Sequence, residues 1–177
     1  MASTGLVPLL NLPLFAGRQT TGAALPASAA AGTFGCTVGT IVGSGAAGED
    51  AKLVSEVANN NTKTDTVIYD VMFPLSHFCG DSFTLSVRAL HTRAAGAGTV
   101  SIDAAVRVIN SSGQTGADLC STAAQTLTAG TASFVNFTIN STDIDAGARL
   151  LIAITAVVTA GDANNNSVTI NSIRLGA

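Results

Sequence analysis

The pattern of apolar and polar positions has a period of two along much of the chain. Residues 83–89, 100–108 and 135–139 each place apolar side chains at alternate positions, and residues 67–73 repeat the pattern. This alternation is typical of β-strands that bury one face against a core. The sequence therefore predicts a series of half-buried strands.

Two later segments depart from simple alternation. Residues 149–159 are apolar at most positions on both faces, which predicts a central strand covered on both sides. Residues 167–175 change phase between Ile170 and Ile173. One extra residue in a strand produces such a change, so we expect a β-bulge between these two isoleucines.

Short turn segments separate the predicted strands. Residues 141–147 predict one helical turn, capped by Ser141 and ended by Gly147. Roughly six to eight strands without long helices indicate a sandwich or barrel. Connections too long for tight hairpins favour a jelly roll over a meander. The predicted fold class is all-β: an antiparallel β-sandwich, a jelly roll, with an extended N-terminal arm.

The arm is predicted over residues 1–35 and the sandwich domain over residues 36–177. Pro8, Pro13 and Pro26 disfavour helix in the arm and favour extended backbone. Its apolar side chains either lie along the domain's own surface or bind a neighbouring molecule. The residues predicted to bind a partner are Leu6, Leu9, Leu10, Leu12, Leu14 and Phe15.

Charged residues are scarce. The chain has 177 residues, of which 47% are hydrophobic and 11% charged, whereas about 25% charged residues is usual in a globular domain. The formal net charge of −3 excludes the basic surface of a nucleic-acid-binding protein. Because monomers rely on charge to stay apart, we expect much of this surface to be covered by other molecules.

Neither a membrane segment nor a cysteine framework is predicted. The apolar stretch at 150–160 is shorter than the roughly 20 residues that span a bilayer. No basic residue precedes Arg18 and prolines interrupt the N-terminal apolar run, so a secretory signal is not expected. Cys36, Cys79 and Cys120 have neither disulfide-framework nor zinc-site spacing, and we expect small buried thiols in a reducing compartment.

Residues 43–48 match the G-x-G-x-x-G pattern of dinucleotide-binding proteins. An apolar run precedes them, residues 49–58 have partly helical spacing, and Asp70 follows about twenty residues later. The motif requires a βαβ unit, but no second helix is predicted after Asp70. Residues 53–57 read equally well as a short strand. We therefore predict no bound cofactor.

No catalytic or metal-binding group is predicted. His77 and His91 lack the local signature of a nucleophilic triad and are interpreted as structural. Asp143, Asp145 and Asp162 lack calcium-loop spacing and are interpreted as turn or capping residues. The protein is therefore not expected to be an enzyme.

The order of features in the C-terminal half carries a family resemblance. The segments concerned are a linker at 116–125, a strand at 134–139, a turn ending at Gly147, an apolar strand at 150–158 and a closing Ile173-Arg174-Leu175. Over about residues 66–175 the chain resembles the jelly-roll cement or decoration proteins on the heads of tailed bacteriophages. It departs from them at Ala148 and Arg149, where family members often carry an acid.

The resemblance implies a structural virion protein. Such a protein is made in the host cytoplasm, binds the outer capsid surface as a homotrimer and stabilises contacts between copies of the major capsid protein. The arm suits this role, because an extended segment can add to a neighbour as a strand. Removing residues 1–35 is then expected to leave a folded domain that no longer binds capsids.

Two alternatives remain at the sequence level. A receptor- or carbohydrate-binding β-sandwich module of a tail fibre or spike predicts an exposed aromatic or acidic patch; the chain has no tryptophan and one tyrosine. A hydrolase on a β-sandwich scaffold predicts converging carboxylates with perturbed pKa values.

Overall fold

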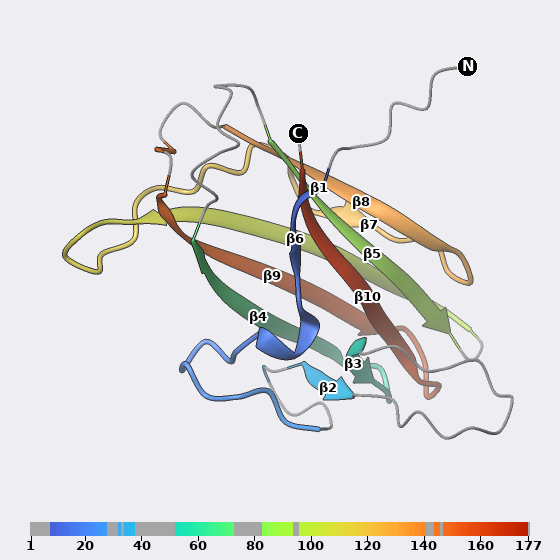
Figure 1. The fold of residues 1–177 in the computed structure, drawn as a ribbon. Helices are drawn as coiled ribbons and strands as arrows, with labels where there is room; N and C mark the ends of the chain where they lie inside the picture. The colour runs from blue at the N-terminus through green and yellow to red at the C-terminus, as the bar shows by residue number, and fades with distance from the viewer. Residues whose placement is uncertain are drawn as a thin grey trace, which may run out of the picture.

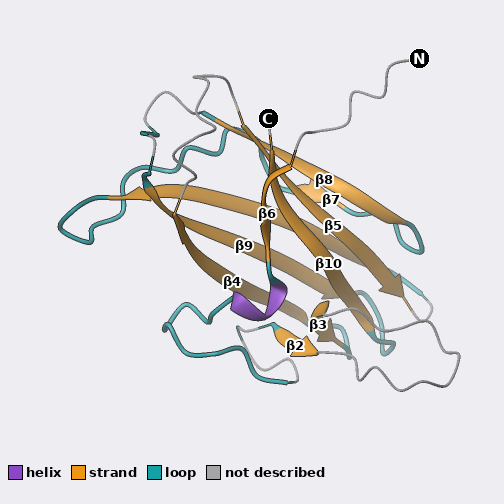
Figure 2. Ribbon diagram, in the orientation of Figure 1, coloured by secondary structure: helices purple, strands orange, loops and turns teal. Residues whose placement is uncertain are grey.

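The computed structural model describes residues 8–27, 32, 34–37, 52–72, 83–93, 96–140, 144–145 and 147–176. Within these ranges the regular secondary structure consists of strands, apart from one short 3-10 helix, η1 (Leu14–Ala16). Figure 2 shows this helix beside two layers of strands. The predicted all-β class is confirmed.

The first layer, sheet A, has all its paired strands antiparallel. Its order is β2-β3-β10-β5-β8, and β1 also pairs with β10. The strands are β1 (Pro8–Leu12), β2 (Gly35–Thr37), β3 (Lys52–Val57), β5 (Phe83–Arg93), β8 (Ala132–Ile139) and β10 (Asn166–Gly176).

The second layer, sheet B, has the order β4-β9-β6-β7 and is also antiparallel. Its strands are β4 (Thr62–Met72), β6 (Gly98–Ile109), β7 (Gln125–Thr126) and β9 (Arg149–Ala160). Strands β3, β10, β5 and β8 thus lie side by side in one sheet, and β4, β9, β6 and β7 lie side by side in the other. The chain crosses repeatedly between the two sheets in this order, which is the jelly-roll topology. The two layers are visible in Figure 1.

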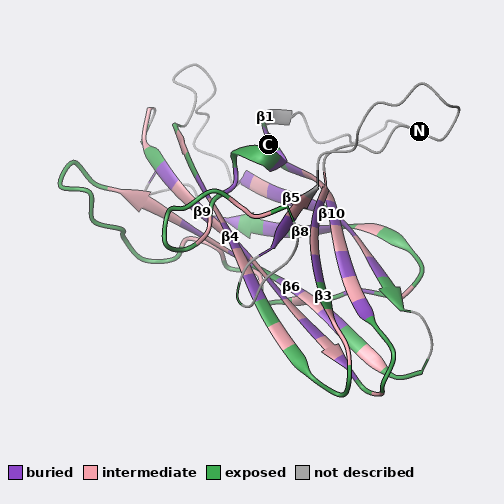
Figure 3. Ribbon diagram, turned by 90° about the horizontal axis from the view of Figure 1, so that it is seen from below, coloured by how far each residue is buried: buried purple, intermediate pink, exposed green. Residues whose placement is uncertain are grey.

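The core fills the space between the two sheets. Buried residues alternate with more exposed ones along the long strands, as Figure 3 shows. Tyr69, Phe137, Ile152 and Leu85 are among the largest fully buried side chains. The period-two pattern of the sequence therefore corresponds to one inward and one outward face per strand.

The predicted bulge in β10 is confirmed. The register of β10 against β5 shifts between Ile170 and Ser172. On the other edge of β10, β3 pairs with residues up to Ile170 and β1 pairs from Ile173 onward. The bulge therefore lies where one partner strand replaces another.

The arm folds against its own domain. After β1 and η1, Arg18 exchanges two backbone hydrogen bonds with Ile68 of β4, at 2.8 and 2.9 Å. The arm thus crosses from sheet A to the edge of sheet B and covers one side of the sandwich. Gly17 allows this close approach, because a Cβ there would lie 2.5 Å from the Val67 side chain.

Two predictions from the sequence, the full covering of β9 and the helical turn at 141–147, differ from what the structure describes. Strand β9 is central in sheet B, as predicted, but its outward residues are only half-buried, so the described part of the chain does not cover both its faces. In the segment predicted as a helical turn, Ile144 and Asp145 have no regular structure, and the amide of Ala148 closes a turn on Asp145. Residues 141–143 lie outside the described residues.

Candidate binding surfaces

The outward side chains of sheet B form a surface that we call the β9 face. Its centre is a row of small and apolar residues in register, Ile68 of β4, Ala153 of β9 and Ala105 of β6. Leu151 lies beside this row and Met72, 72% exposed, lies near its end. The remaining outward residues of these three strands are Thr62, Thr64, Thr66, Asp70, Thr99, Ser101, Asp103, Arg107, Ile109, Arg149, Thr155, Val157 and Thr159.

Several hydroxyls of the β9 face are satisfied within it. The Oγ1 atoms of Thr66 and Thr155 lie 3.0 Å apart, and those of Thr62 and Thr159 lie 3.1 Å apart. Cross-strand threonine pairs of this kind stabilise a sheet. They also lower the cost of covering the face, because these hydroxyls have a partner before any other protein binds.

An ion pair lies at one end of the β9 face. The Arg149 guanidinium donates two hydrogen bonds to the Asp70 carboxylate, one of them 2.7 Å long. These hydrogen bonds are the main reason why the pKa of Asp70 is lowered, and the same bonds raise the pKa of Arg149. Asp70 thus has a structural partner in Arg149.

The Asp70–Arg149 pair predicts a small pH-dependent effect. Because the folded-state pKa of Asp70 is lowered, the stabilisation is present above the unfolded-state pKa and is lost as pH falls through the folded-state pKa. Asp70→Asn should cost less than about 1 kcal/mol at neutral pH, since both groups are solvent-exposed. Urea unfolding should show the difference between variant and wild type vanish in acid; a difference that persists there would contradict this assignment.

The arm residues predicted to bind a partner divide into three groups. Leu12 and Leu14 are buried in the core of the same chain, and Leu10 packs against it. This corrects the expectation for Leu12 and Leu14, which face inward because the edges of β10 and β4 accept the arm. Phe15 is 70% exposed and remains available. Leu6 and the side chain of Leu9 lie outside the described residues.

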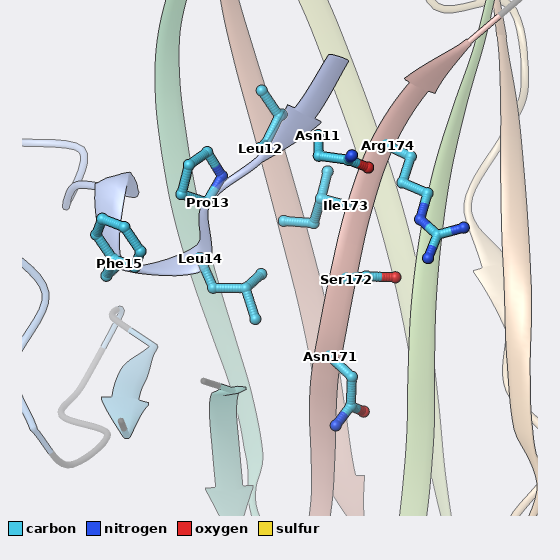
Figure 4. A pocket seen from close by; sticks show the side chains of 9 residues that line it. All are labelled: Asn11, Leu12, Pro13, Leu14, Phe15, Asn171, Ser172, Ile173 and Arg174. Carbon is cyan, nitrogen blue, oxygen red and sulfur yellow. The ribbon is translucent and has the colours of Figure 1, made fainter. Parts of the chain in front are cut away.

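A groove runs between the arm and β10. It has a volume of about 370 Å³ and lies beside the β10 bulge (Figure 4). Its lining combines apolar arm residues with polar residues of β10: Asn11, Leu12, Pro13, Leu14, Phe15, Asn171, Ser172, Ile173 and Arg174. None of these described lining residues is acidic.

Buried polar residues gather near one end of the sandwich. Asp65 is fully buried, and its Oδ2 lies 2.8 Å from the Lys63 ammonium; apart from this ion pair neither carboxylate oxygen has a hydrogen-bond partner. His91, 2% exposed, lies 3.2 Å from Asn166 Oδ1, and Asn166 donates to the Thr159 carbonyl of the other sheet at 2.8 Å. The structural interpretation of His91 agrees with this contact.

The buried Lys63–Asp65 ion pair was not predicted from the sequence. Lys63 and Asp65 share the inward phase of Val67 and Tyr69 in β4, so the alternation alone could have indicated that both face the core. The alternation was followed only from residue 67, so this earlier part of the strand was not considered.

The remaining cysteines and acids considered in the sequence analysis lie on different parts of the fold. Cys36 and Cys120 are partly buried, and burial raises the pKa of both thiols, as small buried thiols should show. Asp145 is exposed. The Asp162 carboxylate accepts hydrogen bonds from the amides of Asn164 and Ala97, which lower its pKa. It is a turn residue, as predicted.

Some sequence candidates lie outside the described residues: the glycine motif at 43–48, His77, Cys79 and Asp143. Among the residues that are described, no three His, Cys, Asp or Glu side chains are grouped to hold a metal ion. The same part of the chain has no helix long and apolar enough to cross a bilayer. Residues 53–57, an alternative helix in the dinucleotide interpretation, belong to strand β3, and the sheets have no parallel βαβ unit in the described ranges.

No protein-family model matches the chain, and no curated protein matches its sequence. Among solved structures, the chain is similar to the CBM22-1 xylan-binding domain of Paenibacillus barcinonensis Xyn10C, with 12% identity and a TM-score of 0.45, over 99% of this chain and 97% of that one. A carbohydrate-binding module of the β-sandwich superfamily matches at 14% identity and a TM-score of 0.46, over 82% and 58% of the two chains.

A viral structure is also similar. The chain of the infectious bursal disease virus Gt strain matches at 15% identity and a TM-score of 0.36, over 86% of this chain and 41% of that one. These likenesses extend to the β-sandwich fold and no further.

Proposed function

We propose that this chain is a structural virion protein that decorates the outer surface of a phage capsid and stabilises contacts between copies of the major capsid protein. The observation that carries the proposal is the β9 face, which is apolar at its centre and has several of its threonine hydroxyls already paired. The charge pattern of this face is compatible with the proposal, because two of its four charged residues, Asp70 and Arg149, are already paired with each other, which lowers the cost of covering them. The protein acts without catalysis and as a homotrimer.

The arm has a different part in this proposal from the one its composition suggested. With Leu12 and Leu14 in the core, the arm completes the domain that presents the β9 face. Among the described arm residues, the exposed Phe15 side chain can contact the capsid. The main attachment is therefore assigned to sheet B.

The proposal predicts that a charge at the centre of the β9 face abolishes attachment. Ala153→Glu places a carboxylate between Ile68 and Ala105, where it is solvated in the free protein and buried without a partner on the capsid. Affinity for heads of the parent phage assembled without this chain should fall at least about tenfold, measured by co-sedimentation. Analytical ultracentrifugation should give the mass of a trimer for the wild-type chain.

The matched control is Thr128→Glu, which makes the same charge change at an exposed position between β7 and β8. It should bind heads like the wild type. Equal binding by Ala153→Glu would remove the β9 face from the proposal, and failure of the wild type to bind heads would end the capsid assignment.

A carbohydrate-binding module is the second candidate function. It is favoured by Phe134, which is 49% exposed on the outer face of sheet A, among polar side chains. This alternative predicts an exposed aromatic or acidic patch, and Phe134 supplies one exposed aromatic ring on a strand face. The two functions use opposite faces of the sandwich, so each can be tested separately.

A further inference from the structure

Two arginines on the outer face of sheet A have no acidic partner among the described residues. Arg88 of β5 lies opposite Ser172, and Arg174 of β10 lies opposite Ser86, so the two arginines are diagonal neighbours on adjacent strands. Such neighbours are about 7–8 Å apart, within reach of long side chains. Glu56, the one acid on this face in the described strands, lies toward the other end of the sheet.

An aromatic ring holds one of these arginines in place. The Arg174 guanidinium carbon lies 5.7 Å from the centroid of the Phe134 ring, within the range of a cation–π contact. Phe134 is also the direct cross-strand neighbour of Arg88. Ser86 lies on the same face between its cross-strand neighbours Arg174 and Asn136, and it is 6% exposed. The positive charge is therefore held at a defined position.

The surrounding groups are neutral and polar. Asn136 accepts a hydrogen bond from Ser86 Oγ at 2.7 Å, which orients its amide, and Asn11 of β1 lies opposite Arg174. Figure 4 shows Ser172 and Arg174 on the same side of β10, away from Leu14. The backbones of β5 and β10 are paired with strands on both sides here, so a ligand on this face can be recognised only by side chains.

The arginine, aromatic and amide side chains on this face favour one class of anionic ligand over another. A peptide strand gains affinity mainly by pairing its backbone with a free sheet edge, and this face offers none at its centre. A saccharide presents hydroxyls that both donate and accept, which match the amides of Asn136 and Asn11. Carboxylates pair with guanidinium groups in charge-assisted hydrogen bonds, and the apolar face of a sugar ring can pack on Phe134.

We infer that the outer face of sheet A binds an acidic polysaccharide, with Arg88 and Arg174 on its carboxylates and Phe134 against a sugar ring. The inference rests on the second candidate function, carbohydrate binding, and names its site and ligand class. It is compatible with capsid attachment through the β9 face, because the two surfaces lie on opposite sheets.

The test measures binding of the full chain to polygalacturonate, with dextran as the neutral polymer and polyglutamate as the acidic peptide. Arg88→Ala and Arg174→Ala should each weaken polygalacturonate binding at least about tenfold, the loss expected when a hydrogen bond to a charged group is removed. Binding should also weaken with added salt. Arg18→Ala removes the same charge from the arm, where the guanidinium donates a hydrogen bond to the Gly22 carbonyl at 3.3 Å, and should leave binding unchanged.

Each other outcome overturns a different statement. Equal binding of dextran, unaffected by the two arginine variants, would overturn this site and leave carbohydrate binding as a function. Equal binding of polyglutamate would show a general anion surface and overturn the saccharide assignment. No binding to any polymer would remove both the inference and the second candidate function, while co-sedimentation with phage heads would still decide the first.

Discussion

Replacing Lys63 with alanine should destabilise the protein by about 3 kcal/mol or more, because it leaves a buried charge without a partner. The Asp65 carboxylate is fully buried in the inward face of β4, and the Lys63 ammonium at 2.8 Å is its one partner among the described groups. Lys63 itself keeps 17% of its side chain exposed. The measurement is the free energy of unfolding from urea denaturation at neutral pH.

A double variant separates loss of charge balance from loss of packing. Lys63→Met with Asp65→Leu removes both charges and keeps apolar volume, and replacing a buried ion pair in this way is often neutral or stabilising. The double variant should therefore regain most of the stability that Lys63→Ala loses. If Lys63→Ala and the double variant are equally unstable, the loss of stability comes from the changed packing at this end of the core and not from the ion pair.

The second large effect is expected at the arm. Leu14→Ala should cost about 3 kcal/mol, because Leu14 is 6% exposed within the core and its truncation leaves a cavity. In a chain of this size that corresponds to a fall of roughly 6–12 °C in the melting temperature. Differential scanning calorimetry of the full chain measures it.

The neighbouring residue is the matched control. Phe15→Ala removes a larger side chain that is 70% exposed, and surface substitutions of this kind usually change stability by less than about 0.5 kcal/mol. A large loss for Leu14→Ala beside a small one for Phe15→Ala is the result expected of an arm docked on its own domain. Equal small losses would mean that the arm does not contribute to the core in solution.

The docked arm also changes what a truncation would report. Composition alone suggested that removing residues 1–35 leaves an intact domain. The structure instead predicts that the truncation uncovers Val67 and Tyr69, removes β1 from the edge of β10, and destabilises the sandwich. Point substitutions such as Ala153→Glu therefore test capsid attachment more directly than removal of the arm.

Local features of the chain were predictable because they depend on local backbone geometry. Alternation at 83–89 and 100–108 identified strands with one buried face, since successive side chains on a strand point to opposite sides. The change of phase between Ile170 and Ile173 identified the bulge for the same reason. These patterns were sufficient to predict the sandwich class.

Contacts between distant segments could be decided only by the tertiary structure. Whether Leu12 and Leu14 face a partner or their own core depends on which strand edges remain free after the sheets have formed. The pairing of Arg174 with Phe134 depends on the register of β10, β5 and β8, which the bulge shifts by one residue. The sequence by itself determined which positions lie on which face of a strand, whereas the neighbours on each face follow from long-range pairing, which no local pattern encodes.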